Sequence, residues 1–487
     1  MTRPMHPPRV HITTYGCQMN QLDAELVAEV LRSSGAELTA DPAAADVLLF
    51  VTCAVRGHAE NRVFSNIGRL AARKRREARL VIGLLGCMAQ EHGAALRERA
   101  PLVDLICAPG RLAELPDLIA QARSGKVAIA LDPVRGEAER APLRVAAKQD
   151  EALDAAEIRR PVCGNSPGQA YVVAMRGCDN FCSYCVVPYV RGPERSRSPA
   201  AVLEEVRRMV GQGARQVTLL GQAVNQYAAE ESGRRWRLAD LLEKAAETPG
   251  LARLAFITNH PRAFDERLAR IFRDVPNVCP YLHMPAQSGS DTVLQRMNRG
   301  YTAAEYLERV AMARAARPDM AVASDFIVGF PGETAADFEA TMELVRRARF
   351  SGAFVFKYSP RPGTSAAKRF PDDVPTQEKR RRNQELLALV EEITGEENRK
   401  FTGRTVRVFV EEVSPRGRQA CPERSRRGGR LNMAKAIQLR GRTPCNRIVV
   451  FDGPPSLVGQ EVDVRIIGSS PLTLFARADS LAGHELR

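Results

Sequence analysis

Apolar runs alternate with stretches of helical spacing over the first 125 residues. The runs lie at 10–14, 47–51, 80–85 and 105–107, and the helical stretches at 21–33, 58–76, 93–99 and 112–123. This alternation predicts a parallel sheet with helices on both faces. Cys17, Cys53 and Cys87 each follow the end of a predicted strand. Because ligands of open parallel sheets gather outside the carboxyl ends of the strands, we expect these three thiols to meet at one edge.

The same alternation returns six times in the middle of the chain. Predicted strands lie at 171–175, 216–220, 253–258, 278–283, 321–328 and 353–357, and helical stretches such as 200–210 and 334–347 follow them. Six βα units favour an α/β fold in the form of a (βα)6 partial barrel, although a complete barrel is also compatible. Its chemistry is expected at the C-terminal ends of the strands.

The C-terminal part has a different pattern. Short β-branched or alternating runs at 405–412, 447–451 and 461–467 are separated by Gly and Pro, which predicts a small β-barrel. Residues 415–440 are rich in Arg and Gly and are predicted to be an inserted loop. We therefore expect an N-terminal αβα domain at 8–125, a linker at 126–163, a central domain at 164–395 and a barrel at 398–487.

Charge adds a candidate partner to this outline. The net charge is +14, and residues 401–487 hold 15 Arg and Lys against 8 Asp and Glu, or +7. Local basicity of this kind suggests a polyanion such as RNA. A solubilising surface explains the charge equally well. The basic stretch at 69–76 has helical spacing, and a solvated helix face is favoured there.

Eleven cysteines in a chain without a secretory pattern point to metal binding or catalysis rather than disulfides. No run of 18 apolar residues is present, and residues 1–10 lack an apolar core, so neither a transmembrane helix nor a signal peptide is expected. A cytoplasmic location is the default expectation.

The densest group of cysteines is a C-x3-C-x2-C run formed by Cys178, Cys182 and Cys185, directly after a strand and Gly177. Three thiolates on one loop can bind three irons of a 4Fe-4S cluster, which leaves the fourth iron open to a ligand. A structural zinc site uses four protein ligands, and no fourth Cys or His lies in the loop. Zinc or a redox thiol pair remain as alternatives.

A C-x3-C-x2-C loop after the first barrel strand resembles the radical S-adenosylmethionine superfamily. The resemblance narrows to its methylthiotransferase family, covers nearly the whole chain, and includes a C-terminal segment similar to an RNA-binding TRAM domain. The matching segments are Thr14–Asn20, Thr52–Arg56, Gly86–Gln90, Val186–Gly192, Arg195–Arg197, Leu220–Gln222, Leu282–His283, Gln287–Asp291, Asn298–Tyr301, Asp325–Glu333 and Lys357–Thr364.

The resemblance implies two 4Fe-4S clusters and S-adenosyl-L-methionine as cofactors. Cys178, Cys182 and Cys185 would hold the cluster that binds S-adenosylmethionine and generates a 5′-deoxyadenosyl radical. Cys17, Cys53 and Cys87 would hold the second cluster, and ordinary buried cysteines are the alternative for these three. No catalytic residue is expected beyond the cluster ligands. The five other cysteines are expected to bind no metal: Cys107, Cys163, Cys279, Cys421 and Cys445.

Two further residues are candidate contacts for S-adenosylmethionine. Tyr184 lies inside the cysteine loop, and Gln222 follows the second barrel strand. Packing is the alternative for Tyr184, and a structural hydrogen bond is the alternative for Gln222. His283 and Gln287 flank the fourth strand end and carry the same ambiguity.

The family resemblance implies addition of a methylthio group to C2 of an adenine in the anticodon stem-loop of tRNA. The Tyr15–Asn20 and Val186–Tyr189 segments favour the branch acting on N6-dimethylallyladenosine. The expected partners are tRNA, an electron donor and a sulfur donor, with no membrane contact and a monomeric state. The alternatives are a sister enzyme acting on threonylcarbamoyladenosine or a ribosomal protein, and a non-catalytic iron–sulfur RNA-binding protein.

Overall fold

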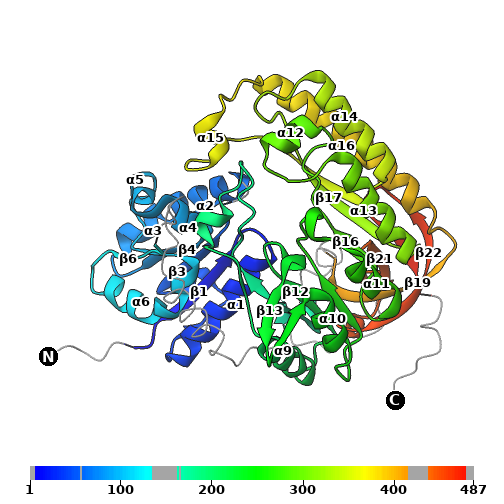
Figure 1. The fold of residues 1–487 in the computed structure, drawn as a ribbon. Helices are drawn as coiled ribbons and strands as arrows, with labels where there is room; N and C mark the ends of the chain where they lie inside the picture. Colours follow the sequence, from blue (N-terminus) through cyan, green and yellow to red (C-terminus); the bar gives the residue numbers. More distant parts are fainter. Residues whose placement is uncertain (1–5, 55–56, 134–161, 164–165, 415–436, 479–487) are drawn as a thin grey trace, which may run out of the picture. The chain divides into compact units, whose positions relative to one another are not determined.

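The computed structural model describes residues 6–54, 57–133, 162–163, 166–414 and 437–478, and Figure 1 shows its ribbon. The chain forms two compact units. The first contains residues 1–160, 176–181 and 185–195, and the second contains 161–175, 182–184 and 196–487. The cysteine loop at 178–185 thus contributes residues to both units. Within the described residues, no helix is both long enough and apolar enough to cross a bilayer.

A six-stranded parallel sheet forms the middle of the first unit, in the order β2-β1-β3-β4-β5-β6. The strands are β1 (Arg9–Thr14), β2 (Glu37–Leu38), β3 (Val47–Thr52), β4 (Val81–Gly86), β5 (Leu105–Cys107) and β6 (Ala128–Ala130). The four predicted strands are confirmed. The sequence predicted neither β2 nor β6, and β6 occupies the start of the predicted linker at 126–163.

Helices cover both faces of this sheet. They are α1 (Gln18–Ser33), α2 (Gly57–Arg69), α3 (Ala71–Arg76), α4 (Cys87–His92), α5 (Leu96–Arg99) and α6 (Leu115–Arg123), with 3-10 turns η1 (Pro42–Ala44), η2 (Gly93–Ala95) and η3 (Pro109–Glu114). Leu49 in β3 packs in the core that α1 and α6 cover, and its neighbour Phe50 packs in the core that α2 and α4 cover. Strands buried on both faces explain the continuous apolar runs in the sequence.

The two predicted helices at 58–76 and 93–99 are each interrupted. The first ends at Arg69 and resumes at Ala71, and the second consists of a 3-10 turn followed by a single α-helical turn. Helix α4 was not predicted, because its six residues are too few to establish a helical period. Its first residue is Cys87, so this short helix sets the position of one candidate iron ligand.

The second unit contains the predicted barrel strands. The central segment has β7 (Val162–Cys163), β8 (Ser166–Pro167), β9 (Gln169–Val173), β10 (Met175–Arg176), β11 (Arg195–Ser196), β12 (Gln216–Leu220), β13 (Ala228–Glu231), β14 (Arg234–Arg237), β15 (Arg253–Phe256), β16 (Tyr281–His283), β17 (Ala321–Val328) and β18 (Gly352–Lys357). Six of these form two parallel sheets, β15-β12-β9 and β16-β17-β18, which a bridge between Leu254 and Val278 connects. Among the described residues β18 does not pair with β9, so the predicted partial barrel is confirmed.

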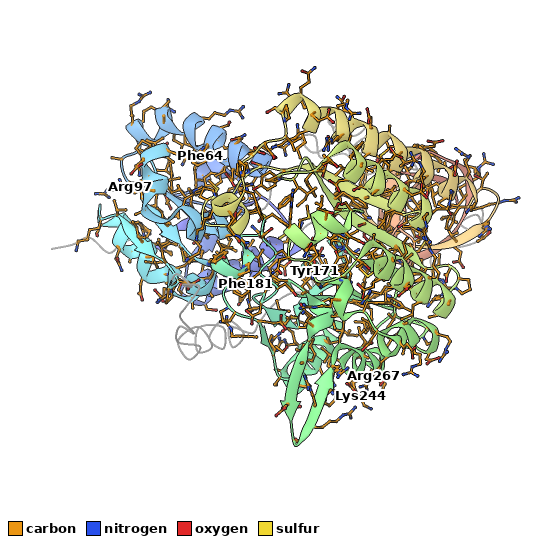
Figure 2. The ribbon with its side chains drawn as sticks, turned by 45° about the horizontal axis from the view of Figure 1, so that its top comes forward. Phe64, Arg97, Tyr171, Phe181, Lys244 and Arg267 are labelled. Carbon is orange, nitrogen blue, oxygen red and sulfur yellow. The ribbon has the colours of Figure 1, made fainter. Side chains whose placement is uncertain are left out.

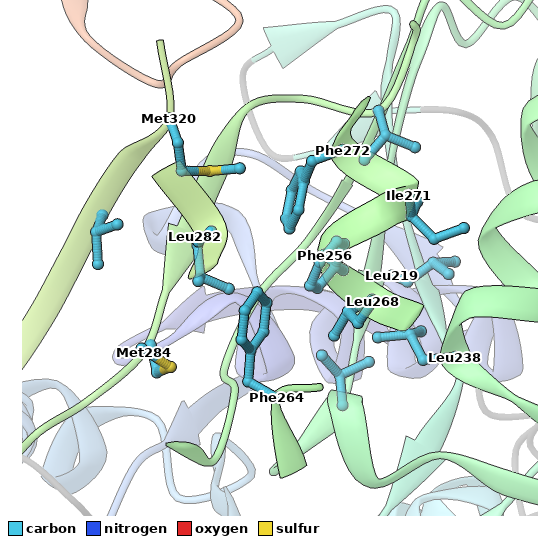
Figure 3. Close-up of a cluster of buried hydrophobic side chains, with 14 of the residues drawn as sticks. Leu219, Leu238, Phe256, Phe264, Leu268, Ile271, Phe272, Leu282, Met284 and Met320 are labelled. Carbon is cyan, nitrogen blue, oxygen red and sulfur yellow. The ribbon is translucent and has the colours of Figure 1, made fainter. Parts of the chain in front are cut away.

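One face of these strands packs against helices. The helices of the central segment are α8 (Val187–Val190), α9 (Pro199–Gly211), η4 (Val224–Gln226), α10 (Leu238–Ala246), η5 (Pro261–Ala263), α11 (Glu266–Asp274), α12 (Asp291–Arg296), α13 (Ala303–Ala316), α14 (Ala335–Ala348), α15 (Ser365–Arg369) and α16 (Thr376–Arg399). Figure 3 shows the centre of the resulting core, where Leu219 of β12 and Phe256 of β15 lie near Phe272 of α11. Alternate residues such as Thr218 point to the other face, which leaves them available to line the barrel interior.

The C-terminal segment forms a closed five-stranded barrel in the order β19-β20-β21-β23-β22. Its elements are β19 (Thr405–Val413), β20 (Ile437–Arg442), β21 (Ile448–Gly453), η6 (Pro455–Leu457), β22 (Glu461–Ser469) and β23 (Leu474–Arg477). The predicted small barrel is confirmed. The predicted insert at 415–440 was too long, because β20 begins at Ile437, and residues 415–436 lie outside the described part of the chain.

Polar contacts join this barrel to the starts of the parallel strands. Arg253, the first residue of β15, donates to Glu461 Oε1 at 2.6 Å and to the carbonyl oxygen of Arg442 at 2.9 Å. Gln169, the first residue of β9, donates to Glu411 Oε1 at 3.2 Å. The C-terminal barrel therefore packs at the N-terminal ends of the parallel strands. Their C-terminal ends are left free to carry a ligand or active site.

Candidate active site

Cys17, Cys53 and Cys87 lie at the carboxyl ends of three adjacent strands. Cys17 precedes α1 after β1, Cys53 follows the last residue of β3, and Cys87 begins α4 directly after β4. Gly16 allows this approach, because it has φ = 134° and a Cβ there would lie 2.5 Å from the Cβ of Cys53. The fold thus brings together three thiols that are distant in sequence.

The surroundings of these thiols favour negative charge at one of them. A hydrogen bond with Cys53, aided by Arg191 and opposed by burial, lowers the pKa of Cys17 to about 6. Burial raises the pKa of Cys87, and Arg191 opposes that increase. Anionic thiolates are the form that binds iron, so the guanidinium of Arg191 favours the ligating state.

Arg191 belongs to the same unit as the three thiols and follows α8. Its Nε donates to Cys87 Sγ at 3.0 Å, and its two terminal nitrogens donate to the carboxylate of Asp23 at 3.3 and 2.5 Å. Val190 packs beside Ala54 and Cys87 in a small apolar cluster. Arg191 lies in the Val186–Gly192 motif, but the sequence indicates no role for it, because its partners lie more than 100 residues away.

A tight turn positions the start of the C-x3-C-x2-C loop. Gly177 has φ = 75°, and a Cβ there would lie 1.9 Å from the carbonyl oxygen of Pro193, so only glycine fits. Cys178 donates its N–H to Gly192 O at 3.2 Å, and Asn180 Nδ2 donates to Cys178 Sγ at 3.2 Å. Residues Gly192 and Pro193 therefore hold the backbone at Cys178 in position.

Phe181 stabilises the middle of the loop. It has φ = 46°, which is strained for a residue with a Cβ, and its ring packs edge-on against Tyr189 at 6.1 Å. Figure 2 labels Phe181 among the side chains of the molecule. Strained backbone of this kind is concentrated at functional sites.

Cys182 is held within the second unit by a buried arginine. Arg299 Nη1 donates to Cys182 Sγ at 3.2 Å, Nε donates to Tyr301 OH at 2.9 Å, and Nη2 donates to Pro285 O at 2.9 Å. Arg299 is 5% exposed. Arg299 lies in the Asn298–Tyr301 motif. The sequence indicates no role for this residue, because no local pattern connects it to a cysteine 117 residues earlier.

Tyr184 and Gln222 lie in different environments. The ring of Tyr184 packs against an apolar cluster that includes Met297 and Phe330, so packing accounts for much of its position. Gln222 follows β12, and its Oε1 is buried without a hydrogen-bond partner among the described residues. A buried amide oxygen without a partner is costly, and a ligand donor at this strand end would remove that cost.

His283 and Gln287 make structural contacts at the end of the second sheet. His283 Nε2 lies 3.3 Å from Asp325 Oδ1. Gln287 has φ = 72°, and its backbone bonds to β17 through Asp325 O and Ile327 N. These contacts engage one ring nitrogen of His283 and the backbone of Gln287.

Each cysteine set supplies three thiols, the number of protein ligands of a 4Fe-4S cluster that keeps one iron open. In the part of the chain that the structure describes, one group of three His, Cys, Asp or Glu side chains has all its ligand atoms within 4.8 Å of one another, namely Glu60, Glu91 and His92. Both cysteine sets fit 4Fe-4S clusters by ligand type and number.

Three of the other cysteines lie in buried positions. Cys107, Cys279 and Cys445 are buried, and burial raises the pKa of Cys107 and Cys279. Thiols of this kind are inert core residues. Cys163 has its backbone in β7, and Cys421 lies outside the described residues.

Three family models match the chain. Residues 172–345 match the radical SAM superfamily, residues 9–108 match the uncharacterized protein family UPF0004, and residues 432–478 match the TRAM domain. Together they cover both cysteine sets and four of the five strands of the C-terminal barrel, β20 to β23.

A solved structure shares the fold. The radical S-adenosylmethionine methyltransferase TsrM from Kitasatospora setae has a TM-score of 0.51 and 15% identity, with 74% of each chain covered. At this identity the similarity concerns the fold alone.

Whole-chain relatives are much more similar. The tRNA-2-methylthio-N(6)-dimethylallyladenosine synthase of Rhodopirellula baltica is 42% identical over 97% of this chain and 96% of its own length. The synthase of the same name from Chromobacterium violaceum is 41% identical over 96% of this chain and 98% of its own. The chain belongs to the tRNA-2-methylthio-N(6)-dimethylallyladenosine synthase family of radical SAM enzymes.

Proposed function

We propose that this protein adds a methylthio group to C2 of N6-dimethylallyladenosine next to the anticodon of tRNA. The observation that carries the proposal is the match of at least 41% identity to synthases of this name over nearly the whole of both chains. The two cysteine sets support this proposal, because their residues follow the C-terminal ends of parallel strands, where α/β folds bind ligands and carry catalytic residues. An electron donor and a sulfur donor are further partners, and we infer a monomer that works in the cytoplasm, where tRNA is modified.

The six cysteines would hold two 4Fe-4S clusters, Cys17, Cys53 and Cys87 one and Cys178, Cys182 and Cys185 the other. When bound, the clusters and S-adenosylmethionine supply the one-electron chemistry that the unreactive C2–H bond of adenine requires. The chain itself orients the ligands and excludes water. Gln222 Oε1 would accept a hydrogen bond from S-adenosylmethionine at the end of β12, and Tyr184 would support the loop by packing.

The outer face of the C-terminal barrel offers a surface for tRNA. Arg465 in β22 lies directly opposite Arg477 in β23, and both are exposed. Like charges directly opposite one another destabilise a sheet unless an anion lies between them. Phe475 is 41% exposed on the same strands, and an exposed aromatic ring can stack on an unpaired base. We infer that this face binds the sugar–phosphate backbone near the anticodon.

Replacing both arginines tests this surface. We expect R465A/R477A to weaken tRNA binding and to lower the slope of log affinity against log salt by about 1 to 2, because each lost phosphate contact lowers it by about 0.7 to 0.9. The measurement is fluorescence anisotropy of labelled tRNA at several salt concentrations. The matched control is R346A/R347A, which removes the same charge from exposed positions on α14. An unchanged slope in R465A/R477A would move the tRNA contact to another face.

Nucleoside analysis tests the reaction itself. A host lacking its own synthase and expressing this chain is expected to regain 2-methylthio-N6-dimethylallyladenosine in its tRNA, as measured by mass spectrometry. Gain of a methylthio group on threonylcarbamoyladenosine or on a ribosomal protein instead would favour a sister activity. Iron-loaded protein that modifies nothing would favour the RNA-binding alternative.

A further inference from the structure

We propose that Arg191, aligned by Asp23, is a positioning residue for the cysteine set Cys17, Cys53 and Cys87. Its guanidinium holds the Cys87 sulfur in place and stabilises the more negative, reduced state of the cluster bound there. This inference rests on the second cluster of the proposed function. It concerns a residue that lies six positions after Cys185, a ligand of the other proposed cluster.

The geometry makes the guanidinium a directed donor rather than a diffuse charge. Asp23 accepts from both terminal nitrogens of Arg191, and this paired contact fixes the plane of the group. With that plane fixed, the N–H on Nε donates to Cys87 Sγ, 3.0 Å away. A lysine could supply the charge but not this three-donor arrangement.

Burial indicates that the pair has a role beyond stability. The side chains of Arg191 and Asp23 are 7% and 1% exposed. A buried ion pair often costs about as much in desolvation as its attraction returns, so it is a weak source of stability by itself. A third, anionic partner changes that balance, and Cys87 is the anion-forming group within hydrogen-bond distance.

A hydrogen bond to a ligating sulfur has a predictable effect on a cluster. Hydrogen bonds and net charge are among the features that set the reduction potential of iron–sulfur clusters. Reduction adds one negative charge, and a donor aimed at the sulfur stabilises that added charge. Loss of the donor should therefore make the cluster harder to reduce.

The experiment isolates the N-terminal cluster in the full-length chain. The background variant C178A/C182A/C185A leaves Cys17, Cys53 and Cys87 as the proposed ligands. After anaerobic reconstitution, the midpoint potential is measured by redox titration followed by electron paramagnetic resonance. In this background R191Q is expected to lower the ratio of reduced to oxidised cluster at a fixed potential about tenfold, or ~59 mV for one electron. R191K, which keeps the charge, is expected to fall between R191Q and the background.

A matched control uses the other buried arginine. Arg299 contacts Cys182 in the second unit, so R299Q in the same background is expected to leave the potential unchanged. If R191Q fails to fold because Asp23 is left unpaired, D23N/R191Q takes its place. A smaller shift in the same direction is then expected, because this variant also removes the negative charge of Asp23.

The outcomes separate the two proposals. A background protein that binds about four irons and has the same potential with or without Arg191 overturns the inference but keeps the second cluster. A background protein that binds no iron overturns the second cluster itself. A lower potential in R191K than in the background protein, with R299Q unchanged, supports the directed hydrogen bond, and a still lower potential in R191Q reports the contribution of the charge.

Discussion

Replacing Cys182 with alanine is expected to abolish reductive cleavage of S-adenosylmethionine, with at least a ~1,000-fold loss of 5′-deoxyadenosine formation. Two thiolates cannot hold the cluster in the geometry that leaves one iron open to a ligand. No side chain of the protein can replace that one-electron chemistry, so the loss should be close to complete. The measurement is liquid chromatography of 5′-deoxyadenosine after reduction of the reconstituted protein with dithionite.

Cys279→Ala is the matched control for this variant. Cys279 is also buried, but burial raises its pKa and its surroundings are those of a core residue. The substitution removes one sulfur from the core and should cost about 1 kcal/mol in stability, with cleavage retained. Comparable cleavage by C182A and the wild type would refute the assignment of the 178–185 loop as the radical-generating site.

Removal of Cys17, Cys53 and Cys87 together is expected to separate the two halves of the reaction. The C17A/C53A/C87A variant should keep about half of the iron, as one cube of two, and should still form 5′-deoxyadenosine. It should form at least ~100-fold less methylthiolated tRNA, because the cluster expected to carry the transferred sulfur is gone. Iron and sulfide content, 5′-deoxyadenosine and modified nucleosides are measured on the same preparation.

Cys107→Ala provides the control within the same unit. Cys107 ends β5 in the apolar core of the first unit, next to the strand that precedes Cys87. Full iron content and normal methylthiolation in this variant would show that losing a buried thiol from the unit is not enough to disturb the cluster. If the triple variant instead retained all its iron, the three cysteines would be ordinary core residues.

The two candidate clusters share a structural feature that the cysteine variants do not test. Each cysteine set has one buried arginine that donates to a thiol sulfur, Arg191 to Cys87 and Arg299 to Cys182. Both arginines lie in family motifs outside the cysteine motifs themselves. In the C178A/C182A/C185A background Arg299 has no sulfur at position 182 to contact, so R299Q serves as the control for R191Q.

The sequence by itself determined the layout of the fold and the candidate ligands. Apolar runs of strand length alternating with helical periods are local features, and they predicted the parallel sheet, the partial barrel and the small C-terminal barrel. The cysteines were identifiable because a C-x3-C-x2-C loop is also local, and because Cys17, Cys53 and Cys87 occupy equivalent positions after strands. Some short elements, such as β2, β6 and α4, were missed.

Only the tertiary structure decided which side chains surround the thiols. Cys87 and Arg191 are 104 positions apart, and Cys182 and Arg299 are 117 apart. No periodicity spans such distances, because the contacts arise from how separately folded segments pack. The unpaired Oε1 of Gln222 and the opposed pair of Arg465 and Arg477 likewise depend on burial and strand register, which are properties of the packed fold rather than of any local segment.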